Sequence, residues 1–295
     1  MPSITTATVQ PLDRGLVDRG RPRKRWRYVG IFGEQLLACA AAVQIGPLRQ
    51  TFWALHLPGT EQGLAVAGGS TPARAAVNRE RTRLLPRRGE LQLLDGAALG
   101  AAGTGLLVLR DRGVFLDLVL AEDAGVQARC PHGRGEVWTR KQAGIAVQGT
   151  LSLDGGAAEP IAARAVIDDT LGYHARETEW RWSAGVGETP DGVPVAWNLV
   201  EGVNDPAQGS ERAVWQDGVP AEAPPVRFAT DLSSIRCEDG SELSFTAAAE
   251  RSRHDNFLLL ASDYRAPFGS FAGTLPGGVE LARGRGVMEH HRARW

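Results

Sequence analysis

The residues best suited to chemistry lie in one segment, Ile161–Val186, where two carboxylates precede a pair of indoles. Asp168 and Asp169 follow an apolar run. Trp180 and Trp182 alternate with an arginine, so both indoles share one face of a predicted strand. Paired indoles form a rigid apolar wall with two N–H donors. Carboxylates near the end of a neighbouring strand would place a proton acceptor beside that wall.

This segment has two interpretations. In the first, it lines a cavity for a small molecule, with an acid or base near the mouth. The candidate acid–base residues are then Asp169, Asp168 and His174, and the candidate ligand contacts are Tyr173, Arg176, Trp180 and Trp182. In the second, the two indoles belong to the core, an aspartate caps a turn, and the histidine lies on the surface.

A second aromatic strand is predicted around Trp138. Residues 136–142 alternate, so that Trp138, Arg140 and Gln142 share one face. Polar groups beside an indole can line a pocket, which makes Trp138 and Arg140 further candidate ligand contacts. The same face can equally be exposed to solvent.

Standard catalytic and cofactor motifs are absent from the sequence. It contains no GxGxxG, GxxxxGK[ST], GxSxG or HExxH pattern. His290 and His291 are adjacent and point to opposite sides of a strand, which makes them poor chelators. The three cysteines show no CxxC spacing. The sequence therefore predicts no metal site, no cofactor and no disulfide framework.

Bulk properties exclude some partners. The formal net charge of the 295-residue chain is -1, which gives no overall attraction to nucleic acid or anionic membranes. No run approaches the ~18 apolar residues of a membrane span, and the first residues lack the layout of a signal peptide. A cytoplasmic protein is expected, and nothing in the sequence indicates its oligomeric state.

The elements expected to position these residues are strands. Residues 114–120 alternate apolar and other side chains with a period of two, which is typical of a half-buried strand. Asp-Gly pairs suited to tight hairpins recur along the chain. They are Asp95-Gly96, Asp154-Gly155, Asp191-Gly192, Asp217-Gly218 and Asp239-Gly240.

Two segments show a different pattern. Residues 34–45 are rich in alanine with a helical stripe, and Gly46-Pro47 would end such a helix. Taken alone this segment is predicted helical, although a β-barrel context would override that propensity. Residues 71–83 are a second helix candidate or a long loop.

From about Arg23 onward, the chain resembles bacterial proteins of domain of unknown function 2804. The resemblance rests on an early Trp-x-Tyr strand, a Trp-Thr-x-Lys-Gln stretch, the Trp-x-Trp segment and the C-terminal ending. These are Trp26 and Tyr28, Trp138 to Gln142 followed by Gly149, Asp169 to Trp182, and Glu289 to Trp295. That family is distantly similar to the AttH-like and carotenoid 1,2-hydratase (hydroxyneurosporene synthase) group.

The resemblance implies an all-β fold of two tandem lipocalin or calycin-like antiparallel β-barrels with few short helices. The implied divisions are a disordered lead-in at 1–22, a first barrel at 23–155 and a second at 156–295. Some distant relatives hydrate, cyclise or isomerise polyenes or isoprenoids. The hydratase-like relatives carry Asp-His followed by Trp-Gly, whereas here Asp168-Asp169 leads to Leu171-Gly172, so a role that needs that histidine does not carry over.

Three functions fit these observations. The first is a binding protein that holds one apolar small molecule in a Trp-lined barrel interior. The second is a cofactor-free hydratase, isomerase or cyclase acting on an isoprenoid-like or polyketide-like substrate, with the indoles steadying cationic charge. The third is a structural or protein-interaction role for the Trp-rich strands. The C-terminal Trp295 is expected to dock on a barrel.

Overall fold

The computed structural model describes residues 14–58, 66–67, 71–72, 81–84, 90–94, 103–257 and 260–294. Within these residues the chain forms strands and turns, and no helix. The Asp95-Gly96 turn, the middle of the 71–83 segment and the expected docking of Trp295 lie outside the described residues.

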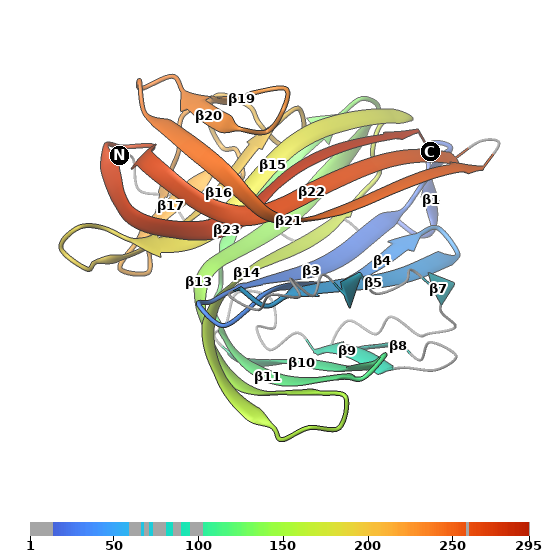
Figure 1. Ribbon diagram of the computed structural model, residues 1–295. Coiled ribbons are helices and arrows are strands. Elements are labelled where there is room, and N and C mark those ends of the chain that lie inside the picture. Colours follow the sequence, from blue (N-terminus) through green and yellow to red (C-terminus); the bar gives the residue numbers. More distant parts are fainter. Residues whose placement is uncertain are drawn as a thin grey trace.

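The strands form two large antiparallel sheets, and each sheet curls into a nearly closed barrel (Figure 1). The first sheet contains β3 (Lys24–Phe32), β4 (Leu37–Ile45), β5 (Leu48–His56), β6 (Val66–Ala67), β7 (Thr71–Pro72), β8 (Arg81–Leu84), β9 (Glu90–Leu94), β10 (Gly103–Asp111), β11 (Val114–Glu122), β12 (Val126–His132), β13 (Gly135–Leu153) and β14 (Glu159–Gly172). Its order is β6-β5-β4-β3-β14-β13-β11-β10-β9-β8, with β7 on β5 and β12 on β13.

The second sheet follows in the chain. It contains β15 (Glu177–Glu188), β16 (Pro194–Glu201), β17 (Ala213–Gln216), β18 (Val219–Glu222), β19 (Val226–Phe228), β20 (Ser234–Cys237), β21 (Glu242–Phe257), β22 (Leu260–Leu275) and β23 (Val279–Arg294). The order β18-β17-β16-β15-β23-β22-β21-β20-β19 places the last strand of the chain beside the first strand of this sheet.

The chain passes from one sheet to the other within residues 173–176. β14 pairs with β13 and β3 along its length, and β15 pairs with β16 and β23. The change of sheet therefore lies after the 155 boundary that the resemblance implies. Near the N-terminus, β1 (Val17–Asp18) and β2 (Arg21–Pro22) form a short hairpin within the 1–22 lead-in.

Residues 37–45 form β4 and not a helix. Most side chains of this strand are buried on both faces, since Ala38, Ala40 and Ala42 belong to one core cluster and Cys39 and Ala41 to another. A strand buried on both faces has no polar alternation, and small apolar residues then mimic a helical pattern. Pairing with β3 and β5 decides the outcome.

Three large core clusters organise the part of the chain that the structure describes. One is formed only by residues of the first sheet and a second only by residues of the second sheet. The third contains residues of both, including Tyr28 and Val166 of the first sheet and Trp182 and Tyr264 of the second. The two sheets thus pack face against face, and their central strands are covered on both sides (Figure 1).

The Asp-Gly pairs in the described residues lie in turns between consecutive strands. The loop between β17 and β18 consists of two residues, Asp217 and Gly218, with φ of 48° and 77°. Two successive positive φ angles define the type I′ hairpin, whose twist matches that of the flanking strands. The three cysteines, Cys39, Cys130 and Cys237, are buried and free.

Candidate functional site

The two indoles of β15 face the first sheet together with side chains of β23. In the β15–β23 ladder, Trp182 lies opposite Glu289 and Trp180 lies opposite His291. Residues two apart on a strand share a face, so these four side chains form one surface. Tyr264 of β22, opposite His291, extends it.

The first sheet contributes a matching surface. Tyr28 of β3 lies opposite Asp168 of β14, which lies opposite Lys141 of β13. Trp26 and Thr170 are the next pair along the same face. This surface meets the second sheet, so that aromatic and charged groups from both sheets are brought together.

A cavity of about 430 Å³ lies between these two surfaces. β3, β4, β5, β13 and β14 line it from the first sheet, and β15, β16, β21, β22 and β23 line it from the second. Most of its wall surface is apolar, as is usual for a small-molecule site, and polar and charged side chains from both sheets also line it.

Aromatic contacts across the two sheets build one wall. The rings of Trp26 and Trp180 are stacked, with centroids 6.3 Å apart and planes 9° apart. Tyr28 meets Trp182 edge to face at 5.5 Å. His174, between the two sheets in sequence, lies 5.3 Å from the Trp26 ring. These contacts hold a rigid apolar surface in place.

Asp168 anchors the polar side of the cavity. Its carboxylate forms an ion pair with Lys141 at 2.7 Å and accepts hydrogen bonds from Trp26 Nε1 and Thr170 Oγ1, each at 2.9 Å. Lys141 Nζ also lies 3.2 Å from Glu211 of the second sheet. Burial would lower the pKa of Lys141, but Asp168 and Glu211 outweigh it and raise that pKa. The ammonium therefore stays charged and links the two sheets.

Glu289 is the carboxyl with the most unusual environment. It is buried, and burial raises its pKa to about 7, although hydrogen bonds from Trp180 and Tyr264 oppose the shift. Trp180 Nε1 donates to Oε1 of Glu289 at 2.7 Å. A carboxyl group with a pKa near neutrality can both give and take a proton under ordinary conditions.

The two histidines of the cavity are neutral. Burial lowers the pKa of His291 to about 3, and Ser262 Oγ lies 2.8 Å from its Nε2. Burial, together with nearby Lys24 and His132, lowers the pKa of His174 well below its ordinary value. Within the part of the chain that the structure describes, Nδ1 of His174 has no hydrogen-bond partner.

Among the described residues, no group of three or more His, Cys, Asp or Glu side chains could hold a metal ion. No helix in the same part of the chain is long and apolar enough to cross a membrane.

A family model described as "Domain of unknown function (DUF2804)" matches residues 112–295. The chain belongs to this family. The match starts at the β10–β11 turn and includes all of the second sheet, so it covers Lys141, Asp168 and Glu289 of the cavity but not Trp26. No curated protein matches the chain in sequence.

Solved structures share the fold of this DUF2804 protein. A protein designated AttH from Nitrosomonas europaea has a TM-score of 0.58 and 15% identity, covering 96% of this chain and 98% of its own. Kievitone hydratase from Nectria haematococca has a TM-score of 0.51 and 12% identity, covering 98% and 95%. CghA with Sch210972 has a TM-score of 0.50 and 10% identity, covering 92% and 88%. At these identities the likeness establishes the tandem-barrel fold.

The structure brings together four of the residues that the sequence singles out. Asp168, His174, Trp180 and Trp182 all line the cavity. The alternation of the two indoles, with both on one face, is as expected from the sequence.

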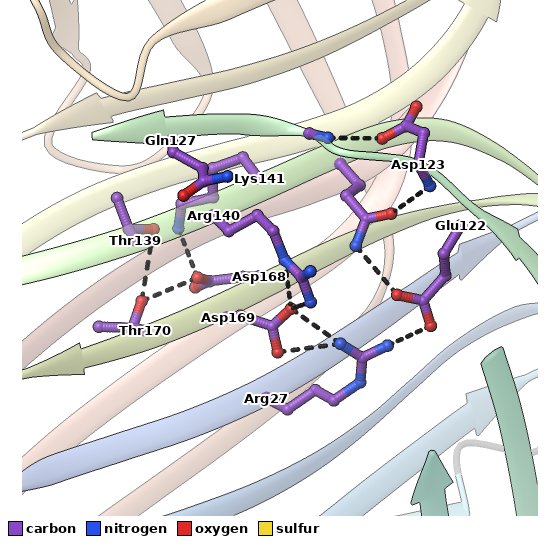
Figure 2. Close-up of polar contacts among 12 residues, drawn as sticks. Arg27, Glu122, Asp123, Gln127, Thr139, Arg140, Lys141, Asp168, Asp169 and Thr170 are labelled. Carbon is purple, nitrogen blue, oxygen red and sulfur yellow. Dashed lines mark hydrogen bonds and ion pairs between the residues drawn. The ribbon is translucent and has the colours of Figure 1, made fainter. Parts of the chain in front are cut away.

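Asp169 and Arg140 lie on the opposite face of the same strands (Figure 2). Two guanidiniums bind the Asp169 carboxylate: Arg27 Nη1 at 2.8 Å and Arg140 Nη2 at 2.6 Å. Arg27 also pairs with Glu122, which accepts a hydrogen bond from Gln142 at 3.0 Å. We call these five residues the Arg27–Asp169 network. It faces the first barrel's interior, so Asp169 is not positioned to touch a ligand in the cavity.

The Arg27–Asp169 network is balanced in charge, with two guanidiniums and two carboxylates. Burial would raise the pKa of Asp169, but Arg27 and Arg140 outweigh it and hold that pKa below its ordinary value. We therefore interpret the network as a structural element of the first barrel.

The other three predicted contacts also lie away from the cavity. Trp138 packs on Leu171 in a small separate cluster. Tyr173 Oη accepts a hydrogen bond from the backbone of Arg14 at 2.9 Å, which fastens the N-terminal segment. Arg176 is exposed.

Sequence reasoning assigned no site role to Trp26, Glu289, His291 or Tyr264, which all line the cavity. A signal was present in the alternation of Glu289 and His291 on one strand face. That signal does not identify what the face meets, because the partner strand lies more than 100 residues away in sequence.

Proposed function

We propose that this protein binds one apolar small molecule in the cavity between its two sheets, with Trp180 and Trp182 as part of the wall. The observation that carries the proposal is the cavity of about 430 Å³, whose wall surface is mostly apolar. Polar side chains in such a lining orient a ligand and provide specificity.

The position of the cavity differs from the barrel interior that the sequence suggests. Buried side chains of the two clusters that each belong to a single sheet occupy the two barrel interiors. The cavity lies at the contact between the barrels. Two of the similar structures are a hydratase and a protein that holds Sch210972, so small-molecule chemistry fits the shared fold.

A cavity-filling variant tests this proposal. Val43 lines the cavity and is half-buried, so Val43→Trp would occupy the space that a ligand needs. We expect this change to weaken binding of the neutral apolar dye Nile red about tenfold or more, measured by dye fluorescence. Val219→Trp is the matched control because Val219 is 69% exposed and outside the cavity lining.

Equal affinity of the two variants for the dye would contradict the proposal. Thermal unfolding of both variants checks that the fold survives. Native mass spectrometry of the protein from its own host then asks whether an apolar molecule is retained, and the Val43→Trp variant should retain less.

We infer a second candidate function, proton transfer to a bound alkene, because of the environment of Glu289. Its protonated carboxyl group would give its proton to one alkene carbon, so that a C–H bond forms while the π bond and the O–H bond break. The resulting cation would lie beside the faces of Trp26 and Trp180. Water would then add at the cationic carbon and return one proton to the Glu289 carboxylate.

Deuterium uptake tests this second function. Farnesol incubated with the protein in D2O should gain carbon-bound deuterium, measured by mass spectrometry, because a reversible protonation exchanges the proton. Glu289→Gln keeps the shape of the side chain but carries no transferable carboxyl proton, and it should show no uptake above the protein-free reaction. Equal uptake by the wild type and the variant would exclude this role for Glu289.

A further inference from the structure

A buried guanidinium lines the cavity at the β21 strand. Arg251 is 8% exposed, and its guanidinium carbon lies 4.0 Å from the Phe52 ring centroid and 5.0 Å from that of Tyr264. These two rings come from different sheets, β5 and β22. Arg251 is therefore held between the two halves of the molecule at the wall of the cavity.

This cation has no anionic partner in the part of the chain that the structure describes. An arginine keeps its charge in proteins and carries five N–H donors. Contacts with aromatic faces attract the charge but accept none of the hydrogen bonds in the guanidinium plane. A charge that is largely removed from water and has no counter-charge is costly.

The acids nearest in the sheet are already paired with other arginines. Asp255, two residues beyond Arg253 on β21, lies 2.6 Å from the Arg253 guanidinium. Glu250 lies 2.8 Å from Arg265 of β22. These pairs leave the charge of Arg251 to be balanced by something that enters the cavity.

The other titratable groups of the wall do not supply that balance. Glu289 takes its hydrogen bonds from Trp180 and Tyr264, and its pKa of about 7 leaves it partly protonated near neutrality. Asp168 and Glu211 bind Lys141. His291 is neutral, because burial lowers its pKa to about 3.

We propose that Arg251 binds a carboxylate at one end of the ligand, so that the cavity takes an amphipathic acid and not a wholly apolar molecule. Arg–carboxylate pairs form two parallel hydrogen bonds, which suits the planar donors left open here. Tyr264 contacts Arg251 and is hydrogen-bonded to Glu289, so the apolar body of such an acid would run past Tyr264 toward Trp180. This inference rests on the proposed function and names the class of its ligand.

Paired probes that differ only in charge test the inference. cis-Parinaric acid, a fluorescent polyene acid, and its methyl ester have the same apolar body. Titrations are followed by probe fluorescence at a pH at which the acid is ionised. We expect the wild type to bind the acid at least about tenfold more tightly than the ester, as one charge-assisted pair implies.

Variants of Arg251 should change the preference for the acid over the ester and leave the binding of the apolar body unchanged. Arg251→Met should bind the acid only as tightly as the ester, and Arg251→Lys should keep part of the preference. Arg265→Met is the control, because Arg265 lies on the neighbouring strand outside the cavity lining and pairs with Glu250. It should keep the full preference for the acid.

Three outcomes would overturn the inference. Equal binding of acid and ester by the wild type would leave the apolar-ligand proposal standing and remove the carboxylate. A uniform loss of both probes in Arg251→Met would indicate a packing role only. Failure of the wild type to bind either probe would remove both proposals together.

Discussion

Neighbouring carboxylates on β14 lie in two contrasting regions of the molecule (Figure 2). Asp169 belongs to the Arg27–Asp169 network, in which each buried charge has an opposite partner. Asp168 lies on the other face, in a cavity where Arg251 and Glu289 have no ion pair among the described residues. This contrast indicates that paired buried charges support the fold, whereas buried charges without a full set of partners mark a surface that meets a ligand.

The largest expected effect comes from breaking the network. Asp169→Asn removes the carboxylate that Arg27 and Arg140 share, so that two buried guanidiniums each lose one charge partner. We expect the free energy of unfolding to fall by about 3–5 kcal/mol. Denaturant unfolding measured by tryptophan fluorescence gives this value.

The control for this change is a pair at the surface of the same sheet. Asp117 pairs with Arg110, and its side chain is 48% exposed. Asp117→Asn should change the free energy of unfolding by no more than about 0.5 kcal/mol. Similar losses of unfolding free energy in the two variants would mean that burial does not increase the contribution of the Arg27–Asp169 network to stability.

A smaller effect, on the pH dependence of stability, is expected at Glu289. Its pKa rises from an ordinary 4.5 to about 7 in the folded protein, so the folded state binds this proton more tightly than the unfolded chain. The stabilisation that Glu289 contributes is fully present below pH 4.5 and is lost as the pH rises through 7. Relative to the wild type, Glu289→Gln should gain up to about 3 kcal/mol across that window. Unfolding measured at several pH values tests this.

The opposite sign is expected for Asp169. Its pKa is lowered in the folded protein, so its contribution is present above 3.8, its ordinary value, and is lost as the pH falls through the folded pKa. If the difference in free energy of unfolding between Glu289→Gln and the wild type stayed constant from pH 5 to 8, Glu289 and Asp169 would not be in contrasting environments.

Strand prediction succeeded or failed according to how many faces a strand buries. β11 alternates between buried and less buried side chains along its length, and its period of two is readable in the sequence. β4 is buried on both faces, so the same test returned a helical pattern. The Asp-Gly turns were readable because they depend on local backbone geometry.

The candidate site was predicted in part for the same reason. Alternation placed Trp180 and Trp182 on one face, and they line the cavity. Asp168 and Asp169 were both acid–base candidates, because the sequence could not decide which of these adjacent residues faces the indoles. Glu289 was not identified, because its partner Trp180 is 109 residues away in sequence.

Local sequence patterns were enough to predict the β-rich class, several turns, the family and which side chains share a strand face. These properties follow from local conformational preference and from the period of two. The folded chain was needed to show which faces meet, that the cavity lies between the barrels, and which buried charges are balanced. Those features depend on pairings between distant strands, and no local pattern records them.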